Sequence, residues 1–183
     1  ISRRELFSRP AEVTLHERNV ITMVTGIVIP HETRLEIFTH EFSDLASYQA
    51  AVGGYIEPVT IERPRITIFA NEEGKVHGLP INRRATCLWW LLSPSIRGHD
   101  ILVGDIALVG SRGGPGSTTD LPSDFVNLLL ETKSYRIEVQ TVTESKVWYG
   151  NQVQFETYFE AGIYAINLAE RWTQVRNVRV IAV

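Results

Sequence analysis

Short apolar runs broken by glycine, proline and charged residues fill residues 20–110, and this pattern predicts several strands. Residues 20–29 are rich in β-branched side chains, so they predict a strand buried on both faces. Further apolar runs predict strands over 35–39, 55–61 and 66–70. The punctuation between these runs is dense, which indicates short and specified loops.

Apolar residues at three- to four-residue spacing predict three helices in the same part of the chain. The first covers 43–52, with Ser43 as its N-cap, and two glycines follow its last turn. The second starts after Pro80 and stops at Pro94, and the third covers 121–130.

Two segments between the predicted helices carry polar residues of interest. Residues 71–78 predict a β-hairpin in which Gly74 adopts the left-handed conformation at the turn. Residues 100–110 predict a buried strand that contains Asp105. A carboxylate inside an apolar strand is costly to bury unless it is hydrogen-bonded or lies at a bulge, so Asp105 is singled out.

The pattern changes after residue 132. Residues 135–143 alternate between apolar and polar side chains, and 147–155 predict two short strands joined by a Gly-Asn turn. A Thr-x-x-Glu capping box at Thr157 opens a helix, and residues 178–183 predict the last strand.

Together these elements predict an α+β protein with a mostly antiparallel sheet, three to four helices on one or both faces, and a C-terminal ββαβ module. Residues 1–131 form the predicted first domain and 132–183 the small module. The pattern leaves open whether the module is a separate domain or extends the first sheet.

Composition is typical of a folded protein without a membrane span. The 183 residues are 44% hydrophobic and include four tryptophans, which is enough apolar material for a buried core. No run approaches the roughly 18 consecutive apolar residues of a membrane helix. A net charge of -3 disfavours nucleic-acid binding, because such domains usually carry a basic excess. The single cysteine, Cys87, excludes an internal disulfide framework, so the cytoplasm is the expected location.

No pattern for a metal, a cofactor or covalent catalysis stands out. The five histidines are scattered without metal-ligand spacing, and we expect them on the surface. Cys87 lies beside two tryptophans in a predicted helix and is interpreted as a small core residue. The glycine- and serine-rich residues 111–119 follow a predicted buried strand. They could hold an anion on backbone amides or form a plain surface loop, and no Walker or dinucleotide-binding pattern is present.

The strongest binding candidate is an electropositive pocket at the start of the second predicted helix. Unpaired amides at a helix N-terminus attract anions, and two neighbouring guanidinium groups add bidentate donors for phosphate or carboxylate. The predicted ligand-binding residues are Asn82, Arg83, Arg84, Lys75, His77 and Asp105. An alternative stays open, in which Asn82 caps the helix and the two arginines pair with Glu72 and Glu73.

Several short motifs occur in a recognisable order between residues 35 and 130. They are Val52-Gly53-Gly54, Asn71-Glu72-Glu73-Gly74-Lys75, Gly78-Leu79-Pro80, Asn82, Ala85-Thr86 and Gly104-Asp105. In these motifs the chain resembles a family of uncharacterised domains from phages, plasmids and actinobacterial genomes, a domain of unknown function. The resemblance implies a phage or mobile-element accessory protein that acts in a bacterial cytoplasm. It supplies no catalytic residue.

These observations favour a non-enzymatic accessory protein, with no catalytic residue, cofactor or metal. It would bind a host protein, or sequester a small phosphate-bearing ligand, through residues 71–86. One alternative is an enzyme that acts on a nucleotide or phosphorylated substrate with Asp105, Arg83 and Arg84. Another is a nucleic-acid-binding protein, against which the net charge speaks. Homo-oligomerisation stays open.

Overall fold

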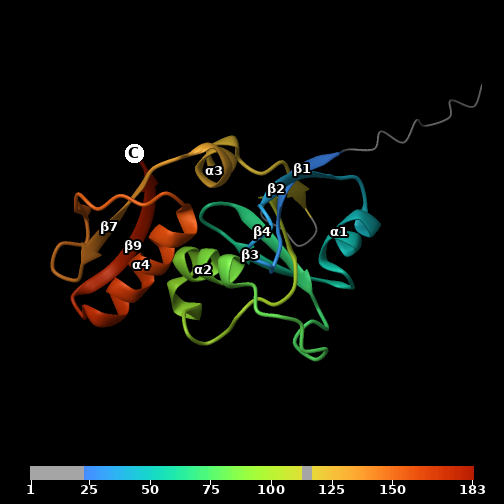
Figure 1. Cartoon of the computed structure of the whole chain (residues 1–183), viewed down its shortest axis with the longest axis horizontal. Coiled ribbons are helices and arrows are strands. Elements are labelled where there is room, and N and C mark those ends of the chain that lie inside the picture. Colours follow the sequence, from blue (N-terminus) through green and yellow to red (C-terminus); the bar gives the residue numbers. More distant parts are fainter. Residues whose placement is uncertain (1–22, 113–116) are drawn as a thin grey trace, which may run out of the picture.

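The computed structural model describes residues 23–112 and 117–183, which form two antiparallel sheets and four α-helices (Figure 1). The predicted α+β class is confirmed. The first sheet has the strand order β2-β1-β5-β4-β3, and β6 pairs with β5. Its strands are β1 (Val24–Ile29), β2 (Phe38–Phe42), β3 (Ile56–Ile61), β4 (Ile66–Asn71), β5 (Ile106–Ser111) and β6 (Thr118–Thr119).

The central strands β4 and β5 of this sheet are buried on both faces. Because side chains alternate along a strand, Ile68 and Leu108 belong to the larger core, while Phe69 and Val109 belong to a smaller core on the other face. Helix α1 (Leu45–Val52) contributes to the smaller core and α2 (Arg83–Leu92) to the larger one. The first sheet therefore lies between two helices.

The second sheet has the order β8-β7-β9 and packs with α4 (Tyr158–Arg171). Its strands are β7 (Tyr135–Thr141), β8 (Tyr149–Gly150) and β9 (Val175–Ala182). The predicted pairing within 147–155 is wrong, since β8 pairs with β7 and Phe155 forms an isolated bridge to Tyr135. The predicted capping box of α4 is present in part: the Thr157 hydroxyl accepts a hydrogen bond from the Glu160 backbone nitrogen at 3.1 Å, but the reciprocal bond from the Thr157 backbone nitrogen to the Glu160 side chain does not occur in the described structure.

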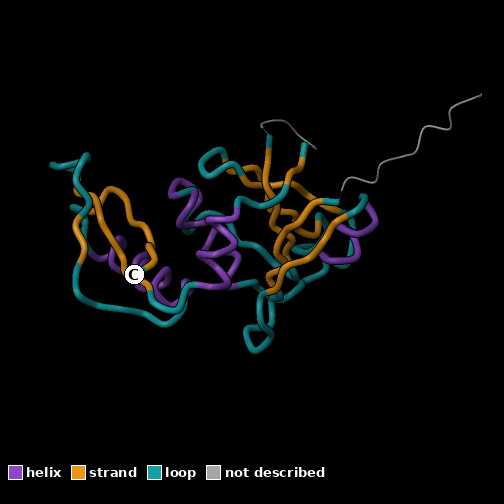
Figure 2. The backbone as a smooth tube through the Cα atoms, turned by 90° about the horizontal axis from the view of Figure 1, so that it is seen from above, coloured by secondary structure: helices purple, strands orange, loops and turns teal. Residues whose placement is uncertain are grey.

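Helices α2 and α4 pack against each other, and residues of both sheets share one buried cluster around them. Figure 2 shows the two sheets at opposite ends of the molecule with helical turns between them. Gly162 permits the close contact, because a Cβ atom there would lie 2.7 Å from Cys87 Sγ and 2.9 Å from Leu91 Cδ1. The sheets are linked along the chain by α3 (Ser123–Val126), which continues into η2, a π-helical turn over Asn127–Glu131. The helix expected over 121–130 is thus present.

The predicted hairpin over residues 71–78 is wrong. The chain makes consecutive turns there. The Asn71 side-chain Oδ1 accepts a hydrogen bond from the Glu73 backbone nitrogen at 3.0 Å, and the Asn71 carbonyl oxygen accepts one from the Gly74 backbone nitrogen at 3.1 Å. The left-handed residue is Gly78, with φ 65°, rather than Gly74. The Asn71 side chain also donates to the Gly53 carbonyl oxygen at 3.1 Å, so this residue is fixed against the end of α1 instead of opening a strand pair.

Several element ends also differ from the prediction. Asp44, not Ser43, caps α1, because its carboxylate accepts from the Ser47 backbone nitrogen at 2.9 Å. Strand β2 begins at Phe38 rather than at residue 35. The strand expected over 100–110 begins only at Ile106, after a left-handed glycine. Of the strand expected over 20–29, residues 20–22 lie outside the described part of the chain. None of the helices within 23–112 and 117–183 has the length and apolar character needed to cross a bilayer.

Candidate functional site

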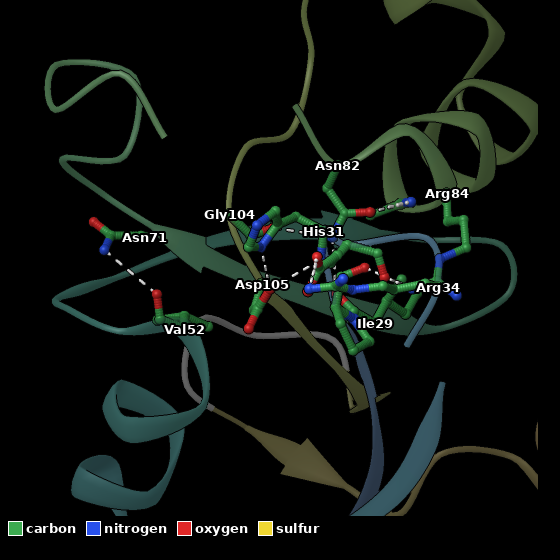
Figure 3. A network of polar contacts seen from close by, with 12 residues as sticks. Ile29, His31, Arg34, Val52, Asn71, Asn82, Arg84, Gly104 and Asp105 are labelled. Atoms are coloured by element: carbon green, nitrogen blue, oxygen red, sulfur yellow. Dashed lines mark hydrogen bonds and ion pairs between the residues drawn. The ribbon is translucent and has the colours of Figure 1, made fainter. Parts of the chain in front are cut away.

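Asn82 is fully buried, and its amide group is used by the fold (Figure 3). Its Oδ1 accepts a hydrogen bond from the Ala85 backbone nitrogen at 3.0 Å, which confirms that Asn82 caps α2. Its Nδ2 donates to the carbonyl oxygens of Ile29 and Gly104 at 2.8 and 2.9 Å. Both amide hydrogens are therefore engaged, and they tie the start of α2 to the end of β1 and to the turn before β5.

Arg84 is likewise engaged with the backbone. Its guanidinium donates to the carbonyl oxygens of Pro30 and Leu35 at 2.8 Å and of Glu32 at 3.1 Å. Partial burial lowers the pKa of Arg84, and the nearby Asp105 carboxylate partly offsets that effect. The function of this side chain is to hold residues 30–35 against the start of α2. No ion pair of Arg83 or Arg84 with Glu72 or Glu73 occurs in the described structure.

Asp105 lies just before β5 and is partly exposed, rather than buried inside a strand as predicted, and its carboxylate is hydrogen-bonded. Its Oδ1 lies 2.7 Å from His31 Nδ1 and 2.8 Å from the His31 backbone nitrogen. The two side chains are 36% and 41% exposed. We call the group formed by His31, Asn82, Arg84 and Asp105 the polar junction. Sequence reasoning singled out Asp105 but missed His31 as its partner, since nothing local relates residues 74 positions apart.

The motif residues that carry the family resemblance have structural roles around this junction and at the end of α1. Gly104 has φ 68°, and a Cβ atom there would lie 2.9 Å from Leu79 Cδ1. Its backbone nitrogen donates to the Pro80 carbonyl oxygen at 2.8 Å. At the end of α1, a Cβ atom on Gly54 would lie 2.5 Å from Asn71 Nδ2. These motifs therefore bring loops distant in sequence into close contact.

The other predicted ligand-binding residues lie outside the polar junction. Lys75 forms an ion pair with Asp100, with its Nζ 2.6 Å from Asp100 Oδ1, and that hydrogen bond lowers the pKa of Asp100. His77 and Arg83 are exposed, and neither side chain has a hydrogen-bond or ion-pair partner among the described residues. Lys75, Arg83 and Arg84 line three different cavities. The structure thus gathers Asn82, Arg84 and Asp105 but not the remaining three.

Sequence reasoning missed a second basic cluster, where the turn between β3 and β4 faces the end of β5. A cavity of about 520 Å³ is lined there by residues 60–65 and by Ser111 and Arg112. We call it the arginine concavity, after Arg63, Arg65 and Arg112. All three arginines are exposed, and within the described chain none of their side chains forms a hydrogen bond or ion pair. Three arginines against one lining acid, Glu62, leave a net positive charge.

The backbone fixes the two halves of the arginine concavity relative to each other. The Ser111 backbone nitrogen donates to the Arg65 carbonyl oxygen at 3.0 Å, and the Arg112 nitrogen donates to the Ser117 carbonyl oxygen at 3.1 Å. Ser111 and Arg112 begin the glycine- and serine-rich segment in which the sequence left an anion-binding role open. Residues 113–116 of that segment lie outside the described chain.

The structure also bears on metal binding and on the single cysteine. In the described ranges, no three His, Cys, Asp or Glu residues come together as a group that could hold a metal ion. Cys87 is buried, which confirms its interpretation as a core residue, and burial raises the pKa of its thiol to about 12.

Comparison with known families gives one match. A family model described as a domain of unknown function, DUF3846, matches residues 24–134, which is more than half of the chain. The chain belongs to the DUF3846 family. No curated protein and no solved structure matches it.

The DUF3846 region begins with β1 and ends just before β7. It contains the whole first sheet, the polar junction and the arginine concavity. Helix α4 and the second sheet follow it, so any site between α2 and α4 combines the DUF3846 region with the C-terminal segment.

Proposed function

We propose that this DUF3846 protein is a non-enzymatic binding protein that holds a small phosphate-bearing anion in the arginine concavity. The observation that carries the proposal is the set of three guanidinium groups around one cavity of about 520 Å³, none of which has a partner among residues 23–112 and 117–183. Guanidinium groups match phosphate oxygens bidentately, and the cavity volume falls in the range of roughly 300–1,000 Å³ typical of small-ligand pockets.

The proposal keeps the ligand class expected from the sequence but changes the residues that bind it. Asn82 and Arg84 are engaged with backbone groups, and Asp105 with His31. Arg63, Arg65 and Arg112 have no such engagement in the described chain. They can therefore accept a ligand without breaking bonds that the fold uses.

A role in a phage or mobile element within a bacterial cytoplasm is part of the proposal, and the motif resemblance supports it. A protein that sequesters a phosphorylated small molecule would act by lowering its free concentration. The host-protein alternative is distinguished in the same experiments, because it requires no affinity for a small anion.

Isothermal titration calorimetry with inorganic triphosphate, ATP and adenosine tests the proposal. We expect saturable binding of triphosphate and ATP but not of adenosine. The triple variant Arg63→Gln, Arg65→Gln, Arg112→Gln should weaken binding by at least about tenfold, because each lost guanidinium removes charge-assisted hydrogen bonds. The control triple Arg83→Gln, Arg171→Gln, Arg176→Gln removes the same charge elsewhere and should leave the affinity nearly unchanged.

Two results would overturn the proposal. Equal losses in the two triple variants would mean that only net charge matters. Binding of a single-stranded oligonucleotide far more tightly than triphosphate would instead favour the nucleic-acid alternative, in which phosphate contacts follow a backbone.

A second candidate function, an enzyme acting on a nucleotide or phosphorylated substrate, is favoured by one observation. Asp105 holds His31 through Nδ1, and Nε2 has no partner in the described chain. A carboxylate that orients an imidazole in this way is an arrangement used by general bases. Release of phosphate from a nucleotide panel, abolished by His31→Gln, would establish this candidate over the binding protein.

A further inference from the structure

A second cavity, of about 420 Å³, lies between α2 and α4. We call it the α2–α4 groove. Its walls are mainly apolar and include Ile81, Trp90, Ile101, Ile163 and Ile166. Ile81 and Ile163 are 51% and 49% exposed, although large apolar side chains at a groove usually gain from being covered. The groove therefore offers apolar surface that the fold leaves open.

The α2–α4 groove also contains a positively charged side chain. Arg83 lines it from the first turn of α2, and its guanidinium has no hydrogen bond or ion pair within the described residues. Glu170 lines the groove from α4 without pairing with Arg83. A single positive group beside an apolar wall is complementary to one negative group on an apolar molecule. Glu170 also interacts electrostatically with Arg97, so its negative charge at the groove is partly offset and leaves room for one further carboxylate beside Arg83.

We propose that the α2–α4 groove binds a small amphipathic carboxylic acid, with its apolar body against Trp90 and Ile163 and its carboxylate on Arg83. The groove volume matches small-ligand pockets, which are mostly apolar with a few placed polar groups. The ligand differs in chemistry from the phosphate-bearing anion of the arginine concavity, so this site is independent of the proposed function.

The groove uses both parts of the chain. Arg83 and Trp90 lie in the DUF3846 region, whereas Ile163 and Glu170 lie in α4, beyond residue 134. The close packing of Gly162 on α2 sets the position of the α4 wall, since a side chain there would collide with Cys87 and Leu91. The α2–α4 groove therefore depends on the packing of α4 against α2, and the DUF3846 region supplies only the α2 side of that contact.

Tryptophan fluorescence of the full chain provides the test, because Trp90 lines the groove. Octanoate is the probe acid, and octanol is its neutral partner. We expect a saturable change with both. Arg83→Gln should weaken octanoate at least about tenfold by removing a charge-assisted hydrogen bond, and should leave octanol unchanged. Ile163→Asn should weaken both, because it replaces apolar wall with an amide.

Matched controls keep the test decisive. Arg176→Gln removes an exposed arginine outside the groove and should change neither affinity. The triple variant of the arginine concavity should retain octanoate binding, which separates the two sites. Equal effects of Arg83→Gln on octanoate and octanol would overturn the proposal. So would unchanged binding in Ile163→Asn, or the absence of any saturable signal.

Discussion

Asp105 Oδ1 lies 2.7 Å from His31 Nδ1 and 2.8 Å from the backbone nitrogen of the same histidine. One carboxylate oxygen thus fixes both the backbone after β1 and the imidazole ring. Next to it, Asn82 binds the carbonyl oxygens of Ile29 and Gly104. Asp105 and Asn82 therefore both attach the turn before β5 to the end of β1. Asn82 also attaches this turn to the start of α2.

The first prediction concerns the tautomer of His31. A carboxylate only accepts hydrogen bonds, so Nδ1 should carry the proton of the neutral ring and Nε2 should be the acceptor. Long-range ¹H–¹⁵N correlation spectra distinguish the two nitrogens directly. In Asp105→Asn the preference for this tautomer should decrease, with a loss of about 1–2 kcal/mol in the free energy of unfolding. An Nε2-protonated neutral ring in the native chain would contradict the assignment.

The second prediction concerns Asn82. Asn82→Ala removes the cap of α2, worth about 1 kcal/mol, and leaves two carbonyl oxygens without their donors, at about 1–3 kcal/mol each where they are buried. We expect a loss of about 3 kcal/mol or more in urea unfolding. The neighbouring Arg83→Ala is the control and should change stability by no more than about 0.5 kcal/mol, because that side chain is exposed.

A third variant separates the two roles of Asn82. Asn82→Asp keeps an oxygen that can cap α2 but cannot donate to Ile29 or Gly104. It should therefore be as destabilised as Asn82→Ala or more so, since it also buries a charge. Stability close to that of the native protein would show that capping alone accounts for Asn82.

Much of the fold is local enough to be predicted from sequence. The glycine after α1 adopts φ 71°, as a helix-ending glycine should, and the Thr157 cap and the Pro94 stop occur where the pattern placed them. The segment after Asn71 was mispredicted because the Asn71 side chain bonds to the end of α1, 18 residues earlier. Turn propensity carries no information about such a contact.

The sites were harder to predict than the elements. Arg84 looked like a ligand-binding residue, but its partners are backbone carbonyls of residues 30–35, which have no sequence signature. The arginine concavity joins Arg63 and Arg65 to Arg112 through a strand pairing, so Arg112 is close to the other two in space but not in sequence. Charge counts along the chain do not reveal such a cluster.

Cys87 gives a prediction about reactivity. Burial raises the pKa of its thiol to about 12, so very little thiolate is present at pH 8. The reaction with Ellman's reagent should be at least about 100-fold slower in the native protein than in guanidinium-unfolded protein, where the thiol is exposed. Since the chain has a single cysteine, the unfolded state is a complete control. Comparable rates would contradict the buried position.

The Lys75–Asp100 pair gives a prediction about pH. The hydrogen bond from Lys75 lowers the pKa of Asp100 below the ordinary value of an aspartate. The pair therefore stabilises the fold above the unfolded-state pKa, and its contribution is lost as pH falls through the lower folded-state pKa. Lys75→Met should cost less than about 1 kcal/mol at pH 7, because the pair is exposed, and less still at about pH 3. Urea unfolding at both pH values checks this, and an equal cost would contradict it.

The most direct test of anion binding follows the arginine side chains themselves. In ¹⁵N-labelled protein titrated with inorganic triphosphate, the Nε–Hε signals of Arg63, Arg65 and Arg112 should shift together and saturate. Those of Arg83 and Arg176 should stay in place. Shifts that are absent, or that spread evenly over all exposed arginines, would contradict a phosphate-binding arginine concavity.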